Sequence, residues 1–352
     1  MTTPGTIPLD PADIREKRRQ NPKMRERDFA RIHSIPEAAL VAAHIGEGVI
    51  RLDCNVARLL EGLPALGEVM ALTRNESAVH EKIGTYGGIS IGEQTGLVIG
   101  DEIDLRVFPP HWRHAFAVSK TGEDGEERHS LQFFDAMGQA VHKVHLRPAS
   151  DVAAYRDFVM RMTSGDQSQS LAPSILPPPA PRGRPASRGE LEESWRALTD
   201  THQFFGMLKR LNLERLEALA MAPRDLAWRL QADSVERMLR GAAEAALPVM
   251  AFVGNPGCIQ IHSGPIEKIE TMGPWLNIFD PSFHLHLRVD QIAELWAVRK
   301  PTRDGYVTSV EAYGADRGLI IQFFGVRHEG VDELAGWRSL AEGLPQLEGE
   351  PA

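Results

Sequence analysis

The chain has 352 residues, more than one hydrophobic core usually serves, which predicts two domains of about 150 residues each. A formal net charge of -9 disfavours a nucleic-acid binder, because such proteins need a basic surface to displace counterions from phosphates. Two cysteines without a CxxC pair cannot build a disulfide framework or a zinc site on their own. The first residues lack the apolar segment of a secretory signal, and no run is long enough to cross a bilayer, so we expect a cytoplasmic protein without membrane insertion.

The first half of the chain begins with helical signals and continues with strand signals. Asp10 or Asp13 is expected to cap a charged helix over 10–31, and Ser34 a second helix whose capping box is completed by Glu37. From Gly67 onward short alternating segments broken by glycine predict antiparallel strands. The expected elements after the second helix are a strand at 49–52, a helix at 55–63, strands at 69–73, 78–82, 96–99, 103–108, 116–118 and 129–134, a bend at 87–92, and a helix at 151–162.

Residues 163–189 form a segment rich in proline, serine and glycine, without apolar periodicity. This composition predicts an extended linker, with a ligand for a polyproline-binding partner as the alternative. The chain then divides into an N-terminal repeat at 1–162, the linker, and a C-terminal repeat at 190–352. In the second half we expect helices at 191–211, 213–222 and 234–246, strands between 249 and 324, and a helix at 331–344.

The strand-rich parts of the two halves match at a constant spacing of 180 residues. The matched pairs include Asn75 with Asn255, Gly84 with Gly264, Leu105 with Leu285, Lys120 with Lys300, and Gly138 with Gly318. A register held this long without gaps indicates an internal duplication. We therefore predict an α+β fold built as a tandem structural repeat, in which each half has helices followed by a large antiparallel β-sheet. A flat ligand would lie in a cleft between the halves.

The two copies differ in their polar residues. Arg106 is matched by His286, His80 by Gln260, and His202 falls opposite Met24. The chain contains no HExxH, P-loop, GxSxG or GxGxxG after a strand. The histidines at 284 and 286 would share one face of a strand, either as ordinary polar positions or as metal ligands. Such differences fit one asymmetric site built from both copies, or two sites that have diverged.

The stretch Thr199–Phe205 places His202 beside two phenylalanines on an expected helix. A lone histidine of this kind is either an ordinary core or surface residue or a ligand, and a haem would need an imidazole on iron and an apolar wall. Arg106 and Phe108 alternate on one strand, so they share a face that could serve as a distal haem wall or hold a cation–π pair. Arg215, Lys300 and Arg327 could pair with haem propionates or be solvated surface charges.

The chain resembles the bacterial cytoplasmic haem-utilisation proteins, or hemin-degrading factors, of the HemS/HmuS/ChuS type. The resemblance covers nearly the whole chain and is most specific in two motifs. These are His202-Gln203-Phe204-Phe205 and Gly254-Asn255-Pro256-Gly257-Cys258-Ile259-Gln260. The linker is long for this family, which affects the expected width of the cleft.

The resemblance implies a role for each candidate residue. His202 would be the proximal ligand to the iron of haem b, Arg106 the distal arginine with Phe108 beside it, and His80 part of a second haem site found in some members. Arg215, Lys300 and Arg327 would contact the propionates.

Three functions follow as hypotheses. A carrier would receive haem from an inner-membrane importer and deliver it, for example to a haem oxygenase. An enzyme would open the porphyrin ring with an external electron donor and release the iron. A duplicated binding domain for another flat anionic ligand is the third. The chain would act as a monomer or a dimer.

Overall fold

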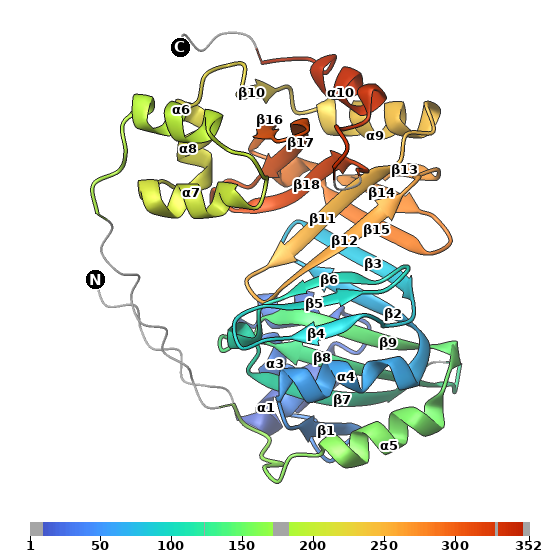
Figure 1. Cartoon of the computed structure of the whole chain (residues 1–352). Coiled ribbons are helices and arrows are strands. Elements are labelled where there is room, and N and C mark those ends of the chain that lie inside the picture. Colours follow the sequence, from blue (N-terminus) through green and yellow to red (C-terminus); the bar gives the residue numbers. More distant parts are fainter. Residues whose placement is uncertain (1–9, 123, 172–182, 328–329, 348–352) are drawn as a thin grey trace. The chain divides into compact units, whose positions relative to one another are not determined.

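The computed structural model describes residues 10–122, 124–171, 183–327 and 330–347 (Figure 1). The chain folds into two compact units. Unit 1 comprises residues 1–74, 81–177 and 255–260, and unit 2 comprises residues 75–80, 178–254 and 261–352. Each half of the chain thus contributes one short segment to the unit formed by the other half. Of the predicted linker, residues 172–182 lie outside the described residues.

The second half of the chain repeats the element order of the first, as the duplication predicts. The first half contains α1(Pro11–Gln20), α2(Glu26–Ile32), α3(Glu37–Ala42), β1(Val49–Leu52), α4(Val56–Glu61), η1(Leu63–Leu66), β2(Gly67–Arg74), β3(Ala78–Gly84), β4(Ile89–Ile91), β5(Gly96–Ile99), β6(Asp104–Val107), η2(Pro109–His111), β7(His114–Thr121), β8(Glu127–Phe134), β9(Ala140–Ser150) and α5(Val152–Met162).

The second half contains α6(Arg188–Arg196), α7(Gln203–Leu211), α8(Arg215–Met221), β10(Ala227–Leu230), α9(Ser234–Glu244), β11(Val249–Asn255), β12(Cys258–Gly264), β13(Ile269–Met272), β14(Trp275–Phe279), β15(Phe283–Arg288), η3(Val289–Gln291), β16(Glu294–Thr302), β17(Gly305–Tyr313), β18(Leu319–Gly325) and α10(Ala335–Glu342). The fold is therefore the predicted α+β tandem repeat, with helices followed by large antiparallel sheets.

In unit 1 the strands β1, β7, β8, β9 and β2 lie side by side in this order. Alternate residues of β7 face opposite sides of the sheet because the side-chain period of a strand is two. Ala115 and Ala117 pack into one core with α4, η1 and α5, and Phe116 and Val118 pack into another with α3. The sheet of unit 1 is thus covered by helices on both faces.

Unit 2 has the same layers, with the strand order β10, β16, β17, β18 and β11. Leu295 and Ala297 of β16 pack towards α9 and α10, whereas Trp296 and Val298 pack towards α6, α7 and α8. Figure 1 shows α6, α7 and α8 gathered together, and α9 beside α10. The face under α6–α8 carries the candidate residues described below.

The two helices predicted at the beginning of unit 1 differ from the structure, one by a break and one in its start. Asp10 caps α1 as expected, its side chain accepting from the backbone N–H of Ala12 at 2.7 Å, but Pro22 separates α1 from α2. The prediction of Ser34 as a cap was wrong, since α3 begins after Pro36 and Ser34 has a φ of 54°. The carboxylate of Glu37 binds Arg74 and Lys143 in place of closing a capping box.

The predicted helix at 191–211 is two helices, α6 and α7, separated by a turn at 197–202. The residues expected to form a bend at 87–92 include the short strand β4. The last helix, α10, begins at Ala335, later than predicted. No helix in the described part of the chain is long and apolar enough to cross a membrane.

Candidate functional site

His202 is the N-cap residue of α7 and belongs to the turn that interrupts the predicted helix. Its side chain is 89% exposed. Asp200 fixes the imidazole from one side, with its Oδ1 2.7 Å from the ring Nδ1. A carboxylate only accepts hydrogen bonds, so Nδ1 is the donor in this contact, and the remaining ring nitrogen, Nε2, makes no part of it. His202 therefore presents its imidazole at the surface of unit 2.

The charges around this turn keep Asp200 ionised. The backbone N–H of His202 donates to its carboxylate at 2.8 Å and is the largest cause that lowers its pKa. Burial opposes this shift, while the His202 side chain and the positive charge of Arg327 lower the pKa further. Arg327 therefore acts on Asp200 through its charge, beside the hydrogen bonds from His202.

The two phenylalanines after His202 have opposite environments. Phe204 is 2% exposed and packs edge-on against Trp195, with ring centroids 4.7 Å apart. Phe205 is 74% exposed, although large apolar side chains are usually buried. Phe204 therefore anchors α7 to its unit, and Phe205 adds an apolar surface next to the exposed imidazole.

Arg215 and Lys300, both expected at the propionates, meet at a buried carboxylate. Glu311 has no exposed surface and accepts from Arg215 Nε at 2.8 Å, Arg215 Nη2 at 2.6 Å and Lys300 Nζ at 3.0 Å. Ser309, Tyr313 and Gln322 donate to the same carboxylate. The ring of Phe204 lies 5.0 Å from the Arg215 guanidinium carbon and 5.1 Å from Lys300 Nζ. The cluster is thus continuous with the anchor of α7.

The cluster contains two cations, Arg215 and Lys300, and one carboxylate, Glu311, so its net charge is positive. Burial alone would raise the pKa of Glu311, but the charges of Arg215 and Lys300 hold it well below its usual range. Burial lowers the pKa of Lys300 to about 8, with Glu311 opposing the shift. Because the Arg215 side chain remains 24% exposed, its guanidinium can accept a further anionic partner.

Beyond the helices the same sheet face continues as an aromatic surface. Phe324 lies 5.5 Å from Lys300 Nζ and meets Phe252 edge-on, with ring centroids 5.0 Å apart. Both phenylalanines are half-buried. An exposed imidazole, a partly exposed guanidinium and half-buried aromatics on one unit fit the needs of a haem: a ligand to iron, a partner for a propionate and an apolar wall.

Arg106 and Phe108 lie in unit 1. In β6 the side chains of Leu105 and Val107 are fully buried, while Asp104 and Arg106 share the half-exposed face. Arg106 forms an ion pair with Asp104, and Phe108 follows the end of the strand. The alternation predicted for this strand is present, and roles at a haem stay predictions for both residues.

His80 lies in the core at the start of β3. It has no exposed surface, and its ring centroid is 4.9 Å from that of Phe283. A second haem site at His80 stays a prediction, and it would require this strand to open.

The pattern of the sequence did not single out Asp200, Glu311, Tyr313 or the aromatic pair Phe252 and Phe324. For Glu311 the signal is the register of the strands. Glu311 pairs with Trp296 in the sheet, so its side chain lies on the sheet face that also carries Lys300. Asp200 stood two residues before the histidine that it binds.

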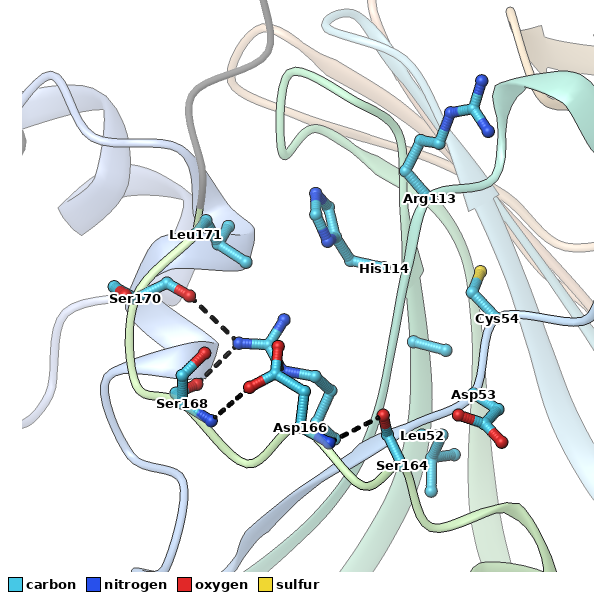
Figure 2. Close-up of a pocket in the computed structure, with 12 residues that line it drawn as sticks. Leu52, Asp53, Cys54, Arg113, His114, Ser164, Asp166, Ser168, Ser170 and Leu171 are labelled. Carbon is cyan, nitrogen blue, oxygen red and sulfur yellow. Dashed lines mark hydrogen bonds and ion pairs between the residues drawn. The ribbon is translucent and has the colours of Figure 1, made fainter.

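Unit 1 contains a separate cavity of about 590 Å³ (Figure 2). Figure 2 shows Asp166, Ser168 and Ser170 on one wall and Cys54 and Arg113 on the other. Burial raises the pKa of Cys54 to about 12, so its thiol stays protonated near neutral pH. Two arginines, Arg51 and Arg113, are balanced by Asp53 and Asp166 among the lining residues, so we do not assign haem to this cavity.

Comparisons with known proteins identify the family of the chain. Residues 34–162 and 212–344 both match the family model described as the haemin-degrading HemS.ChuX domain. The hemin transport protein HmuS of Yersinia pestis is 38% identical over 320 residues, which cover 91% of this chain and 92% of that protein.

Two solved structures are also similar. Holo-PhuS, a heme-binding protein from Pseudomonas aeruginosa, has 41% identity and a TM-score of 0.93, covering 96% of this chain and 100% of that one. The heme degrading enzyme ChuS of Escherichia coli O157:H7 has 37% identity and a TM-score of 0.86, covering 94% of this chain and 97% of that one.

The fold is thus that of a tandemly repeated α+β protein with an exposed histidine at the start of α7. The chain belongs to the HemS/ChuX family of haemin-degrading and hemin transport proteins, which confirms the resemblance found in the sequence.

Proposed function

We propose that this protein binds haem b in the cytoplasm during haem uptake, with His202 as the ligand to iron. The observation that carries the proposal is the exposed imidazole whose Nδ1 is held by Asp200, because this leaves Nε2 available for a metal. The two cysteines stand alone in the sequence and provide no CxxCH attachment, which favours non-covalent haem b.

Further contacts are assigned to residues with matching chemistry. Arg215 and Lys300 would hold a propionate next to Glu311, and Arg327 would contribute positive charge at the turn of His202. Phe205 would cover part of the macrocycle with apolar surface. Arg106 and Phe108 are proposed as haem contacts supplied by unit 1.

Delivery of intact haem is the function we propose first. Its support is the relative named as a hemin transport protein and the neighbour named as a heme-binding protein. In this role the protein would receive haem from an inner-membrane importer and pass it to a haem oxygenase. The neighbour named as a heme degrading enzyme supports the alternative, ring opening with an external electron donor.

An absorption titration with hemin tests both parts of the proposal. Wild type should give a shifted Soret band, His202→Ala should lose it, and His44→Ala should keep it, since His44 bonds to Leu40 within unit 1. Absence of a shift with wild type would refute haem binding. A reductant is then added in air with catalase present. A stable band supports delivery, whereas a decaying band with release of iron supports degradation.

A further inference from the structure

The turn before α7 holds His202 at two points, one on its backbone and one on its ring. Oδ1 of Asp200 accepts from the backbone N–H of His202 at 2.8 Å and from its ring Nδ1–H at 2.7 Å. This one oxygen thus holds both the backbone and the ring of His202. An imidazole with 89% of its surface exposed would otherwise sample several rotamers.

We propose that Asp200 is the positioning residue of the iron ligand, holding His202 in the Nδ1–H tautomer with Nε2 directed outward. This inference rests on the proposed function, because it assigns a role to Asp200 only if His202 binds haem iron. Ligating histidines commonly donate their second N–H to a carboxylate, which sets the tautomer and makes the metal-binding nitrogen more basic.

The orientation of Asp200 is itself set by the fold. Thr199 and Gln203 bond reciprocally across the turn: the Thr199 N–H donates to Gln203 Oε1 at 3.0 Å, and Gln203 Nε2 donates to Thr199 Oγ1 at 3.2 Å. The backbone N–H of Arg303, in the β16–β17 hairpin, donates to the Thr199 carbonyl at 3.1 Å. The turn is therefore tied to the sheet, and the imidazole is ordered before any ligand arrives.

The carboxylate also has an electronic effect that a purely structural residue would lack. A hydrogen bond to a negatively charged acceptor increases electron donation by the imidazole, which stabilises ferric over ferrous iron and lowers the reduction potential. Loss of a partner of this kind usually costs 10–100-fold in metal affinity. Asp200→Ala should therefore weaken hemin binding by about that factor and raise the potential of the bound haem.

The test uses the full-length chain, with Asp200→Ala, Asp200→Asn and, as a matched control, Asp233→Asn, whose carboxylate pairs with Arg237 at the exposed start of α9. Four measurements are made: nitrogen-15 shifts of the His202 ring in the apo protein, the hemin dissociation constant, the reduction potential, and the iron–histidine stretch.

Wild type should show the Nδ1–H tautomer, which Asp200→Ala should lose together with affinity. Asp200→Asn should keep most of the affinity, because an amide oxygen still accepts from Nδ1–H, but its potential should rise. Asp233→Asn should match wild type throughout.

Two outcomes overturn the inference and separate it from the proposed function. If wild type binds hemin while Asp200→Ala keeps its affinity, potential and iron–histidine stretch, Asp200 only shapes the turn. The same conclusion follows if the apo protein shows the Nε2–H tautomer. No Soret shift with wild type would instead refute the proposed function, whatever the tautomer.

Discussion

Replacing Glu311 by glutamine should destabilise unit 2 strongly. The carboxylate is fully buried and compensates both Arg215 and Lys300, whose side chains are 24% and 3% exposed. Glutamine keeps the shape but leaves two cations without a counter-charge. Breaking a buried ion pair by removing one partner costs about 3–5 kcal/mol, because the remaining charge is desolvated and uncompensated. We expect a loss of that size for Glu311→Gln.

Urea unfolding followed by tryptophan emission measures this loss, since tryptophans 195, 228, 275, 296 and 337 all lie in unit 2. Glu342→Gln is the control, because Glu342 is 45% exposed in its pair with Arg299, and exposed pairs contribute about 0–1 kcal/mol. Equal midpoints for the two variants would refute the assignment of Glu311 as the compensating charge.

The same variant should change the pH dependence of stability. In wild type burial lowers the pKa of Lys300 from 10.5 to about 8. Between these values the folded state binds fewer protons than the unfolded state, so the free energy of unfolding rises with pH in this window. Without Glu311 the pKa of Lys300 should fall further, and the rise should begin below pH 8. An unchanged onset would contradict the proposed coupling between Glu311 and Lys300.

The remaining predictions concern neighbouring phenylalanines, a buried histidine and the distal arginine. Phe204→Ala should lower the free energy of unfolding of unit 2 in urea by about 3–5 kcal/mol. Phe205→Ala should change it by no more than about 0.5 kcal/mol but should weaken hemin binding. Equal effects on stability would contradict the different burial of the two rings. Burial lowers the pKa of His142 to about 3, so the unfolded state binds more protons below pH 6.5, and unit 1 should lose about 2 kcal/mol between pH 6.5 and 4.5. Hydrogen exchange in β2 and β9 measures this loss, and protection that does not change with pH would contradict it. Arg106→Ala should alter the Soret band. It should change the free energy of unfolding in urea by no more than about 1 kcal/mol, since the pair of Arg106 with Asp104 is half-exposed.

Much of the fold could be predicted because the signals are local. Alternating apolar positions mark the strands, and Asp10, Asn55 and Asp151 cap helices through their own side chains. The helix break before His202 was missed because the apolar spacing continues through 191–211. It arises from side chains that bond to the backbone of the turn, such as Asp200, which compete with helix formation.

The site was predictable only in part, for a related reason. His202 was recognisable from its motif, yet Glu311 and its two cations come together only through strand pairing and the placement of α8. The internal duplication does not predict a carboxylate at this position. The sheet position that Glu311 occupies opposite Trp296 is held in unit 1 by Gln132, opposite Phe116. A buried charge cluster present in one copy alone cannot be inferred from the pattern that the copies share.

The central claim is that the imidazole of His202 binds the iron of haem, and chemical rescue tests it most directly. His202→Gly removes the ring from a position where 89% of the side chain is exposed, so free imidazole can take its place. We expect the variant to lose the Soret shift of wild type and to recover it with added imidazole, at the wavelength of the wild-type complex. A variant that binds hemin as wild type does without imidazole would contradict the claim, and so would a variant that imidazole fails to restore although its fold is intact.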